Sequence, residues 1–371
     1  MCLKSLVGFF INIYMKNDSL HLDSINKLLL WYNKQSLGVM PWRNTRDPYK
    51  IWLSEIMLQQ TQIKTVIPYY NRWLARLPSL GVVAKAHQKT ILKLWEGLGY
   101  YQRAINFHHS CKFVYKNCNG AVPNTPNDFI KLRGVGDYIC AAVQSIAFNY
   151  KMACLDGNVR RVMSRVLCLD IKKIKNTKRI STLLNKWIQS FDAADFNQAI
   201  MDLGRTVCTP RQPLCTSCPL KLICKAYIED KITLYPIKNV KKNIPIVNVS
   251  IGIIWKNDKF LICKRKNTNF LNGLWELPGG KIEPPETPEA CLKREINEEV
   301  NLKIKILGGR AALINHKYSH FHAKINVFNC VIISSENFIL KNNMKWIFPI
   351  QIKDFPFPRA NHKFFNQMMP K

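Results

Sequence analysis

The sequence predicts two domains of different fold class, an all-α domain followed by an α+β domain. Between residues 18 and 232 apolar residues recur at three- and four-residue spacing, which is typical of amphipathic helices. From residue 246 to residue 371 apolar and polar residues alternate in short runs, which predicts strands. Residues 233–245 are rich in proline and lysine and form the predicted basic linker. The 371 residues are enough for each domain to bury its own core.

The first domain is expected to consist of helices separated by proline and glycine. The clearest helical runs cover residues 51–62, 65–75, 101–115, 137–148 and 158–167. Gly134 and Gly136 form a hairpin directly before one of these runs. Because the first N–H groups of a helix are unpaired and lie at the positive end of its dipole, this hairpin suits a phosphate.

The second domain is expected to be a sheet with one helix. Strands are predicted over residues 247–255, 259–263, 303–306 and 323–333, and a helix over residues 287–299. A domain of this composition belongs to the α+β class.

The charge of the chain points to a polyanionic partner. Lys and Arg number 55 against 24 Asp and Glu, which gives a net charge of +31. The basic residues are spread along the chain, so a folded nucleic-acid-binding surface is favoured over a membrane surface. No run approaches the ~20 apolar residues of a spanning helix. We interpret residues 1–17 as an N-terminal extension that contains the expected true start, Met15, rather than as a secretory signal.

Four of the thirteen cysteines lie within residues 208–224, and their spacing indicates a metal site. They are Cys208, Cys215, Cys218 and Cys224. Thiolates at this spacing bind structural zinc or a [4Fe–4S] cluster, and the spacing alone does not separate the two.

Two carboxyl groups are candidates for catalysis. Glu55 shares a helix face with apolar residues, which predicts a desolvated carboxyl with a raised pKa, as a general acid requires. The alternative is a glutamate at the edge of a surface helix. Asp156 lies in an Asp-Gly turn before a helical run, where it either caps that helix or acts on a nucleotide held by the nearby hairpin.

Five motifs, read in order, resemble the MutY family of adenine DNA glycosylases, within the helix-hairpin-helix superfamily that includes endonuclease III. They are LSEIMLQQTQ, GLGYYQRA, LRGVGDY, LDGNVRRV and the four-cysteine signature, and the resemblance covers residues 37–227. It implies that Glu55 protonates adenine N7 and that Asp156 stabilises an oxocarbenium-like sugar, with Tyr138 and Asn158 assisting. It also implies that the cysteines hold a [4Fe–4S] cluster.

The same resemblance assigns contacts with DNA. Gln59, Gln60 and Tyr100 match positions that enter the duplex around a flipped base. Arg160, Arg161 and Arg165 are expected either to touch phosphates or to form a solvated helix face.

Tyr138 separates two activities within the superfamily. Members that also cut the strand carry a lysine there as Schiff-base nucleophile, and tyrosine forms no imine. We therefore expect a monofunctional glycosylase; a glycosylase/lyase like endonuclease III is the less favoured alternative.

The second domain contains a near-complete Nudix box between Gly280 and Glu299. Glu295, Glu298 and Glu299 share one helix face, which suits Mg²⁺ on a diphosphate, whereas the alternative is an acidic surface helix. Asn301 replaces the usual glycine after this helix and is expected to adopt the left-handed cap.

Around the box the sequence resembles two related domains. Ile251–Lys264 and the DFPFPRAN segment, with Asn361 as the purine-reading residue, resemble MutT, which hydrolyses 8-oxo-dGTP. Tyr318, Ser319 and His320 resemble the loop by which MutY proteins recognise 8-oxoguanine. The domain is therefore expected to read the lesion, and the retained carboxylates leave open that it also hydrolyses 8-oxo-dGTP.

Together these expectations describe a base excision repair enzyme. It would remove adenine paired with 8-oxoguanine or guanine in double-stranded DNA. We expect a monomer, in the cytoplasm of a bacterium and associated with the nucleoid, without a membrane partner. A non-catalytic mismatch-binding module is the competing class, and the presence of both Glu55 and Asp156 argues against it.

Overall fold

The computed structural model describes residues 19–35, 40–237, 243–265, 273–318, 320–334 and 338–368. The predicted extension over residues 1–17, including Met15, and the loop residue Ser319 lie outside these ranges. The chain packs into two compact units. The first contains Met1–Asn71, Ser79–Gly81 and Ser110–Val240, and the second contains Arg72–Pro78, Val82–His109 and Lys241–Lys371. The domain boundaries read from the sequence stay a prediction.

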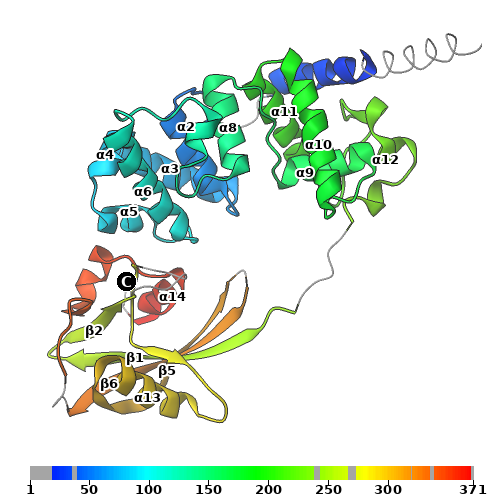
Figure 1. The fold of residues 1–371 in the computed structure, drawn as a ribbon. Coiled ribbons are helices and arrows are strands. Elements are labelled where there is room, and N and C mark those ends of the chain that lie inside the picture. The colour runs from blue at the N-terminus through cyan, green and yellow to red at the C-terminus, as the bar shows by residue number, and fades with distance from the viewer. Residues whose placement is uncertain are drawn as a thin grey trace, which may run out of the picture. The chain divides into compact units, whose positions relative to one another are not determined.

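The described part of the chain before residue 246 is helical, as the sequence predicts (Figure 1). Besides a helix over residues 19–33, it contains α2 (Pro48–Leu58), α3 (Ile63–Arg76), α4 (Leu80–Lys85), α5 (Gln88–Trp95), α6 (Gln102–Asn117), α7 (Pro126–Phe129), α8 (Asp137–Phe148), α9 (Gly157–Leu167), α10 (Ile174–Trp187), α11 (Ala193–Thr206) and α12 (Lys225–Ile228).

The end of α2 differs from the prediction. The helix expected over residues 51–62 begins earlier, because Asp47 caps it and Pro48 occupies its first turn. It ends at Leu58, since the backbone of Gln59 is no longer helical and Gln60 is left-handed, with φ 56°. Gln59 and Gln60 therefore lie on a turn beyond the helix that carries Glu55.

The core of the first unit lies among α8, α9, α10 and α11. Val159, Met163, Leu184, Phe196 and Ile200 are buried in it. The amphipathic spacing of these residues supplies one apolar face on each helix. Packing of these faces fixes the start of α9, and hence Asp156, relative to α8 and α11.

The second unit contains a mixed sheet. Its strands are β1 (Ile246–Lys256), β2 (Lys259–Lys264), β3 (Trp275–Glu276), β4 (Gly279–Lys281), β5 (Lys303–Lys317), β6 (His322–Ser334) and β7 (Met344–Ile347). Among the described residues the order is β3-β2-β1-β6-β5, with β4 paired to β1 and β7 paired to β2. β1 and β6 run parallel, and the other pairs are antiparallel.

The β1–β2 hairpin turns at Asn257 and Asp258, which both have positive φ. Two such residues match the right-handed twist of the paired strands. The hairpin agrees with the expectation drawn from the Ile251–Lys264 segment.

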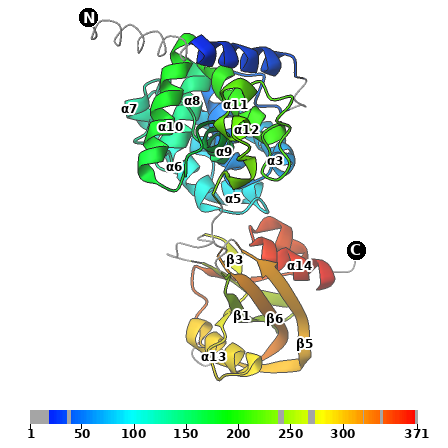
Figure 2. The same ribbon diagram turned by 90° about the vertical axis from the view of Figure 1, so that its right-hand side faces the viewer.

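Two helices cover opposite faces of this sheet (Figure 2). α13 (Pro288–Val300) packs Leu292 and Ile296 against one face, and α14 (Arg359–Met368) packs Phe364 against the other. Gly252 admits α13, because a Cβ there would lie 2.9 Å from Cδ1 of Ile296. The helix predicted over residues 287–299 is confirmed, whereas α14 was not predicted.

Strand β5 is much longer than the predicted residues 303–306. The register shifts between Leu307 and Ala312, where Gly308 has φ 65°, and the strand continues beyond this irregularity to Lys317. The bulge interrupts the alternation that marks a strand, which explains why the sequence pattern ended early.

Candidate active site

Glu55 is a buried carboxyl on α2. Its side chain is 6% exposed and lies among apolar residues of the same helix, including Trp52 and Ile56. Burial raises the pKa of Glu55 above its ordinary value, and the Tyr138 hydroxyl and the charge of Arg43 oppose this shift. The prediction of a desolvated carboxyl with a raised pKa is therefore confirmed.

Tyr138 on α8 contacts this carboxyl directly. Its hydroxyl donates to Oε2 of Glu55 at 2.6 Å. Burial, with the nearby Glu55 charge, raises the pKa of Tyr138 well above its ordinary value, so the phenol keeps its proton. Tyr138 stands at the position where strand-cutting members of the superfamily are expected to carry lysine. Here it serves as a hydrogen-bond donor to Glu55.

Asp156 caps α9 and also belongs to the same electrostatic site. Its Oδ1 accepts from the Val159 N–H at 2.7 Å, and its Oδ2 accepts from Nδ2 of Asn158 at 3.1 Å. Burial raises the pKa of Asp156, while these two donors and the charge of Arg161 favour the ionised form. The charge of Asp156 adds to the rise in the pKa of Glu55, because a nearby anion favours the neutral form of a carboxyl. Capping and a catalytic role are compatible here.

Asn158 links Asp156 to the cysteine loop. Its Oδ1 accepts from Nη2 of Arg161 at 2.9 Å, and Nε of Arg161 donates to the carbonyl of Cys208 at 2.8 Å. Gly204 on α11 allows this packing, because a Cβ there would lie 2.7 Å from Cβ of Asn158. The geometry therefore couples the position of the Asp156 side chain to the loop.

Arg165 is buried, so it does not form the solvated helix face that was one of the two expectations, whereas Arg161 is partly exposed and its contact with phosphate stays a prediction. Arg165 is 3% exposed and donates to the carbonyls of Thr209, Pro210 and Tyr235. Thr209 and Pro210 lie in the loop after α11 and Tyr235 follows a short 3-10 helix, and the guanidinium satisfies these carbonyls. Arg160 donates to Oγ1 of Thr177.

The sequence analysis missed Arg43 and Asp202. Nη2 of Arg43 lies 3.0 Å from Oδ2 of Asp202, which is 2% exposed, and the charge of Arg43 acts on Glu55. Asp202 stands between Met201 and Leu203 in an apolar helical run, and a carboxyl in such a run is the signal that was available.

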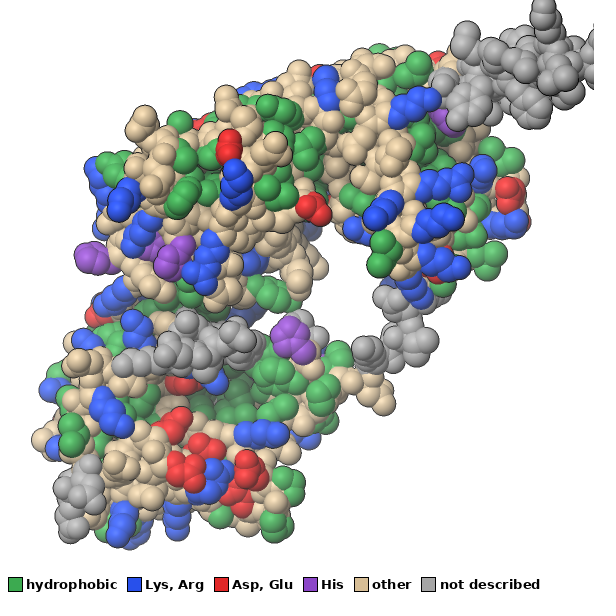
Figure 3. All heavy atoms as spheres, in the orientation of Figure 1, with side chains coloured by type: hydrophobic (Ala, Val, Ile, Leu, Met, Phe, Trp, Pro, Cys, Tyr) green, Lys and Arg blue, Asp and Glu red, His purple; other side chains and the backbone are tan. Residues whose placement is uncertain are grey.

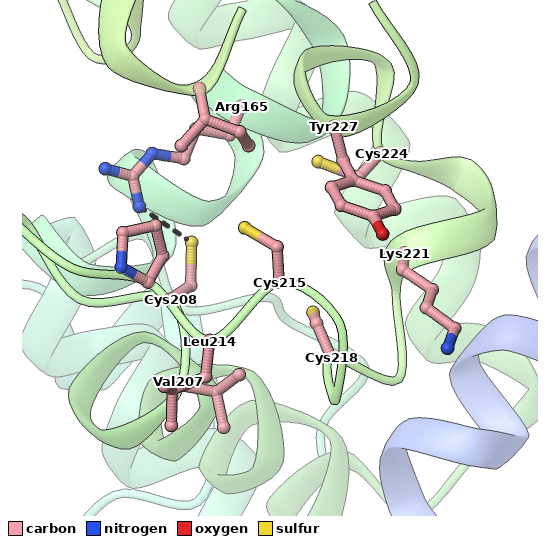
Figure 4. A pocket seen from close by; sticks show the side chains of 11 residues that line it. Arg165, Val207, Cys208, Leu214, Cys215, Cys218, Lys221, Cys224 and Tyr227 are labelled. Atoms are coloured by element: carbon pink, nitrogen blue, oxygen red, sulfur yellow. Dashed lines mark hydrogen bonds between the residues drawn. The ribbon is translucent and has the colours of Figure 1, made fainter. Parts of the chain in front are cut away.

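The four cysteines line one cavity with Arg165, Leu214 and Tyr227 (Figure 4). Nη1 of Arg165 donates to Sγ of Cys208 at 3.2 Å. Burial raises the pKa of Cys218 to about 12 and that of Cys224 to about 11, so both need a cation to become thiolates.

In the part of the chain that the structure describes, no group of three or more metal-binding side chains is drawn together around one point. The four thiols nevertheless line one cavity, and a four-iron cluster takes one thiolate at each corner. The donor set and the shared cavity fit such a cluster.

The hairpin has the backbone conformation predicted for a phosphate contact. Gly134 has φ 84°, which favours glycine, and Gly136 precedes α8 without a side-chain cap for the first turn of that helix. Tyr100 is left-handed and 40% exposed, with Arg103 5.2 Å from its ring, whereas Tyr101 is buried. Only the first tyrosine is available to a partner.

In the second unit two glycines, Gly279 and Gly280, allow close packing at the Nudix box. A Cβ on Gly280 would lie 2.2 Å from Cδ of Glu295, and Gly279 has φ 138° with Ser250 directly behind it. The Gly279 N–H donates to Oε2 of Glu299 at 3.2 Å. Asn301 caps α13 in the left-handed conformation, as predicted.

Arg294 holds the other carboxylates of the box. It donates to Glu286, Glu295 and Glu298 at 2.7–3.2 Å. These contacts hold the pKa of Glu286 at about 2, whereas burial raises that of Glu299 to about 7. Acidic side chains gather on this unit, with Lys and Arg more frequent elsewhere on the same face (Figure 3). The magnesium site stays a prediction.

A cavity of about 270 Å³ opens beside the box. Its lining includes Glu299 and Gly280 together with Tyr318 and Asn361. The structure therefore brings two predicted base-reading residues to the cavity that the Nudix residues line. His320 is exposed and is not among the lining residues.

In the described residues no helix is long and apolar enough to cross a bilayer.

Family models match both parts of the chain. A model for HhH-GPD superfamily base excision DNA repair proteins matches residues 53–190, and a NUDIX domain model matches residues 250–367.

Relatives with similar sequences span most of the chain. An adenine DNA glycosylase of Buchnera aphidicola subsp. Baizongia pistaciae is 39% identical over 258 residues, which cover 67% of this chain and 70% of the relative. Another, from Buchnera aphidicola subsp. Acyrthosiphon pisum, is 32% identical over 321 residues, covering 86% and 89%. A solved thermostable thymine-DNA glycosylase is 30% identical with a TM-score of 0.51, covering 55% of this chain and 95% of its own. The identity and coverage of the two Buchnera relatives establish that the chain belongs to the adenine DNA glycosylase family.

Proposed function

We propose that this chain removes adenine paired with 8-oxoguanine or guanine in double-stranded DNA by hydrolysing its N-glycosyl bond. The observation that carries the proposal is the arrangement of Glu55, Tyr138 and Asp156. A buried acid with a raised pKa lies in the electrostatic field of a second carboxyl, whose ionised form has its own hydrogen-bond donors. Glycosidic cleavage needs one neutral acid and one anion.

In this mechanism Glu55 donates its proton to N7 of a flipped adenine. The bond between the sugar and N9 breaks, its electron pair goes to the departing base, and positive charge develops on the sugar. Asp156 stabilises that charge. Water then adds its hydroxyl to the sugar, and its remaining proton returns to the Glu55 carboxylate. Tyr138 keeps the Glu55 carboxyl in place throughout. No lysine occupies its position, which supports a monofunctional reaction over a lyase.

Four features of the chain support a duplex substrate. The net charge is +31, the glycine hairpin leaves the start of α8 without a side-chain cap, Gln59 and Gln60 occupy a turn, and Tyr100 is exposed. We assign the hairpin to the phosphates and the other three residues to the stack around the flipped base. A chromosomal substrate places the activity inside the cell.

The four cysteines are proposed to hold a [4Fe–4S] cluster. The cluster would supply a rigid anchor for the loop, and Arg161 ties that loop to Asn158. The chemistry itself uses only protein side chains.

The experiment compares adenine release from duplexes under single-turnover conditions. Wild-type chain should release adenine from A:8-oxoguanine and A:G duplexes and leave A:T intact. Glu55→Gln should bind the same duplexes with unchanged affinity and lose about 10²- to 10⁴-fold in rate. Normal release by this variant would exclude Glu55 as the acid, and duplex binding by wild type without release would favour the mismatch-binding module.

A second activity is favoured by the retained Nudix box and its cavity. We propose that this part of the chain, with Mg²⁺ held by Glu295, Glu298 and Glu299, hydrolyses 8-oxo-dGTP. The fit of Gly280 against Glu295 and the cavity beside Glu299 support it. Full-length chain should release pyrophosphate only with Mg²⁺, and Glu298→Gln should abolish this while leaving adenine release unchanged. Absence of wild-type turnover would make the cavity a lesion reader alone.

A further inference from the structure

Asn197 on α11 is a buried amide that the proposed mechanism does not use. Its side chain is 0% exposed and makes hydrogen bonds to two other parts of the first unit. Nδ2 donates to Oγ of Ser145 on α8 at 2.9 Å and to the carbonyl of Met152 at 2.8 Å. Oδ1 accepts from the Cys154 N–H at 2.8 Å. Asn197 therefore links α8 and α11 to the chain segment that leads to Asp156.

This segment, residues 149–156, lies in neither a helix nor a strand. Backbone polar groups that leave water need hydrogen-bond partners, and here no ladder of a sheet supplies them. Two asparagines do so instead. Asn185 on α10 accepts from the Ala153 N–H at 2.8 Å, and Asn197 bonds the main-chain groups on either side of that N–H. The position of the segment is therefore set by side chains.

The other end of this link lies on the helix face that carries Tyr138. Tyr138 and Ser145 stand seven positions apart on α8, which is close to two helical turns, so both project from one face of the helix. The Tyr138 hydroxyl donates to Glu55 at 2.6 Å. Asn197 therefore joins the helix whose tyrosine holds Glu55 to the segment that ends at Asp156.

Cys154, which Asn197 holds through its N–H, lies close to both carboxyl groups of the site. It is 1% exposed, and its Sγ lies 3.9 Å from Oγ of Ser145. Burial raises the pKa of Cys154 well above its ordinary value, and the charges of Glu55 and Asp156 raise it further. A shift of the chain at Cys154 would therefore move Asp156, two residues further on, relative to Glu55.

We propose that Asn197 is a positioning residue for adenine release, an inference that rests on the proposed catalytic role of Asp156. By tying Met152 and Cys154 to α8, the amide fixes the place of the Asp156 carboxylate relative to Glu55. This placement matters because a misplacement of about 1 Å can cost on the order of 10²-fold in rate. Asn197 acts through Asp156 and not on the substrate.

The test measures adenine release from an A:8-oxoguanine duplex under single-turnover conditions, with the full-length chain in excess, together with the Kd for the duplex. Asn197→Ala should lower the plateau rate at saturating protein by about 10- to 100-fold, while the Kd changes by less than about threefold. Loss of folded protein alone would raise the apparent Kd and leave the plateau rate unchanged. The measurement therefore separates positioning from stability.

Asn185→Ala is the matched control, because Asn185 bonds the same segment but its other side-chain bond is to Ser181 in its own helix. Its plateau rate should stay within about threefold of wild type. Ser145→Ala removes only the α8 end of the link and keeps the helix, since alanine is the best helix former. It should lower the plateau rate by about three- to tenfold. Combined with Asn197→Ala it should add no further loss, as expected for two residues of one link.

The same change in an Asp156→Asn chain separates this inference from the proposed role of Asp156. If Asn197 acts through the anion, Asn197→Ala should slow the Asp156→Asn chain by less than about threefold. An equal loss in both backgrounds, or a wild-type plateau rate in Asn197→Ala, would overturn the positioning role and leave the role of Asp156 standing. A wild-type rate in Asp156→Asn, or no adenine release by the wild-type chain, would overturn both.

Discussion

In the first unit Glu55 and Asp156 lie in a partly buried site without an ion pair to either carboxyl among the described residues, whereas in the second unit Glu286, Glu295 and Glu298 surround Arg294. Burial raises the pKa of Glu55, and the guanidinium lowers that of Glu286 to about 2. The same functional group therefore serves as a proton donor in one unit and as a permanent anion in the other.

The comparison shows that hydrophobic surroundings and counter-charge decide the role of each carboxyl. Moving a carboxyl out of water disfavours its charged form, while a neighbouring cation favours that form. Glu299 combines the two situations, because it belongs to the Nudix box yet desolvation raises its pKa to about 7. Removing single groups from either unit tests this distinction.

Among substitutions of the groups that surround Glu55 and Arg294, the largest effect is expected from Asp156→Asn. The amide still caps α9, so the fold is kept, but the anion that stabilises the sugar is lost, which predicts a decrease of about 10²- to 10³-fold in single-turnover adenine release. Asp192→Asn is the matched control, since Asp192 caps α11 in the same way. Equal losses in both variants would mean that capping, and not the charge of Asp156, matters.

A smaller effect is expected from Tyr138→Phe. The hydroxyl of Tyr138 lowers the pKa of Glu55, so its loss raises that pKa further. Glu55 then stays protonated to higher pH, and the alkaline limb of the pH–rate profile should move to higher pH, while the maximal rate falls by about tenfold. The measurement is the single-turnover rate between pH 5 and pH 9. A limb that moves to lower pH would contradict the assignment.

The smallest effect is expected from Glu286→Gln on thermal stability. The pKa of Glu286 falls from its ordinary value of 4.5 to about 2 in the folded chain. Its stabilising contribution is therefore present above pH 4.5 and disappears as the pH falls towards 2. Because the pair is partly exposed and screened by solvent, the variant should lower the Tm at pH 7 by only about 1–2 °C. A difference that grows at low pH would refute this reasoning.

Much of the fold follows from local patterns. The period of the apolar residues predicted the helices of the first part, and the alternation predicted the start of the sheet, since each pattern reports which face of an element is buried. The sequence pattern missed the second half of β5, because the irregularity at Gly308 interrupts the alternation. It also missed α14, because the apolar face of this helix is short.

The candidate site divides in the same way. The sequence alone determined the types of reacting group, because Glu55, Asp156, the cysteine spacing and the Nudix box are written in short motifs. Only the tertiary structure decided the contacts that set their chemistry: the hydroxyl of Tyr138 on Glu55, and the hydrogen bonds of Arg161 and Arg165 to the cysteine loop. These contacts join residues 44 to 83 positions apart, and such distances are fixed by packing and not by any local pattern.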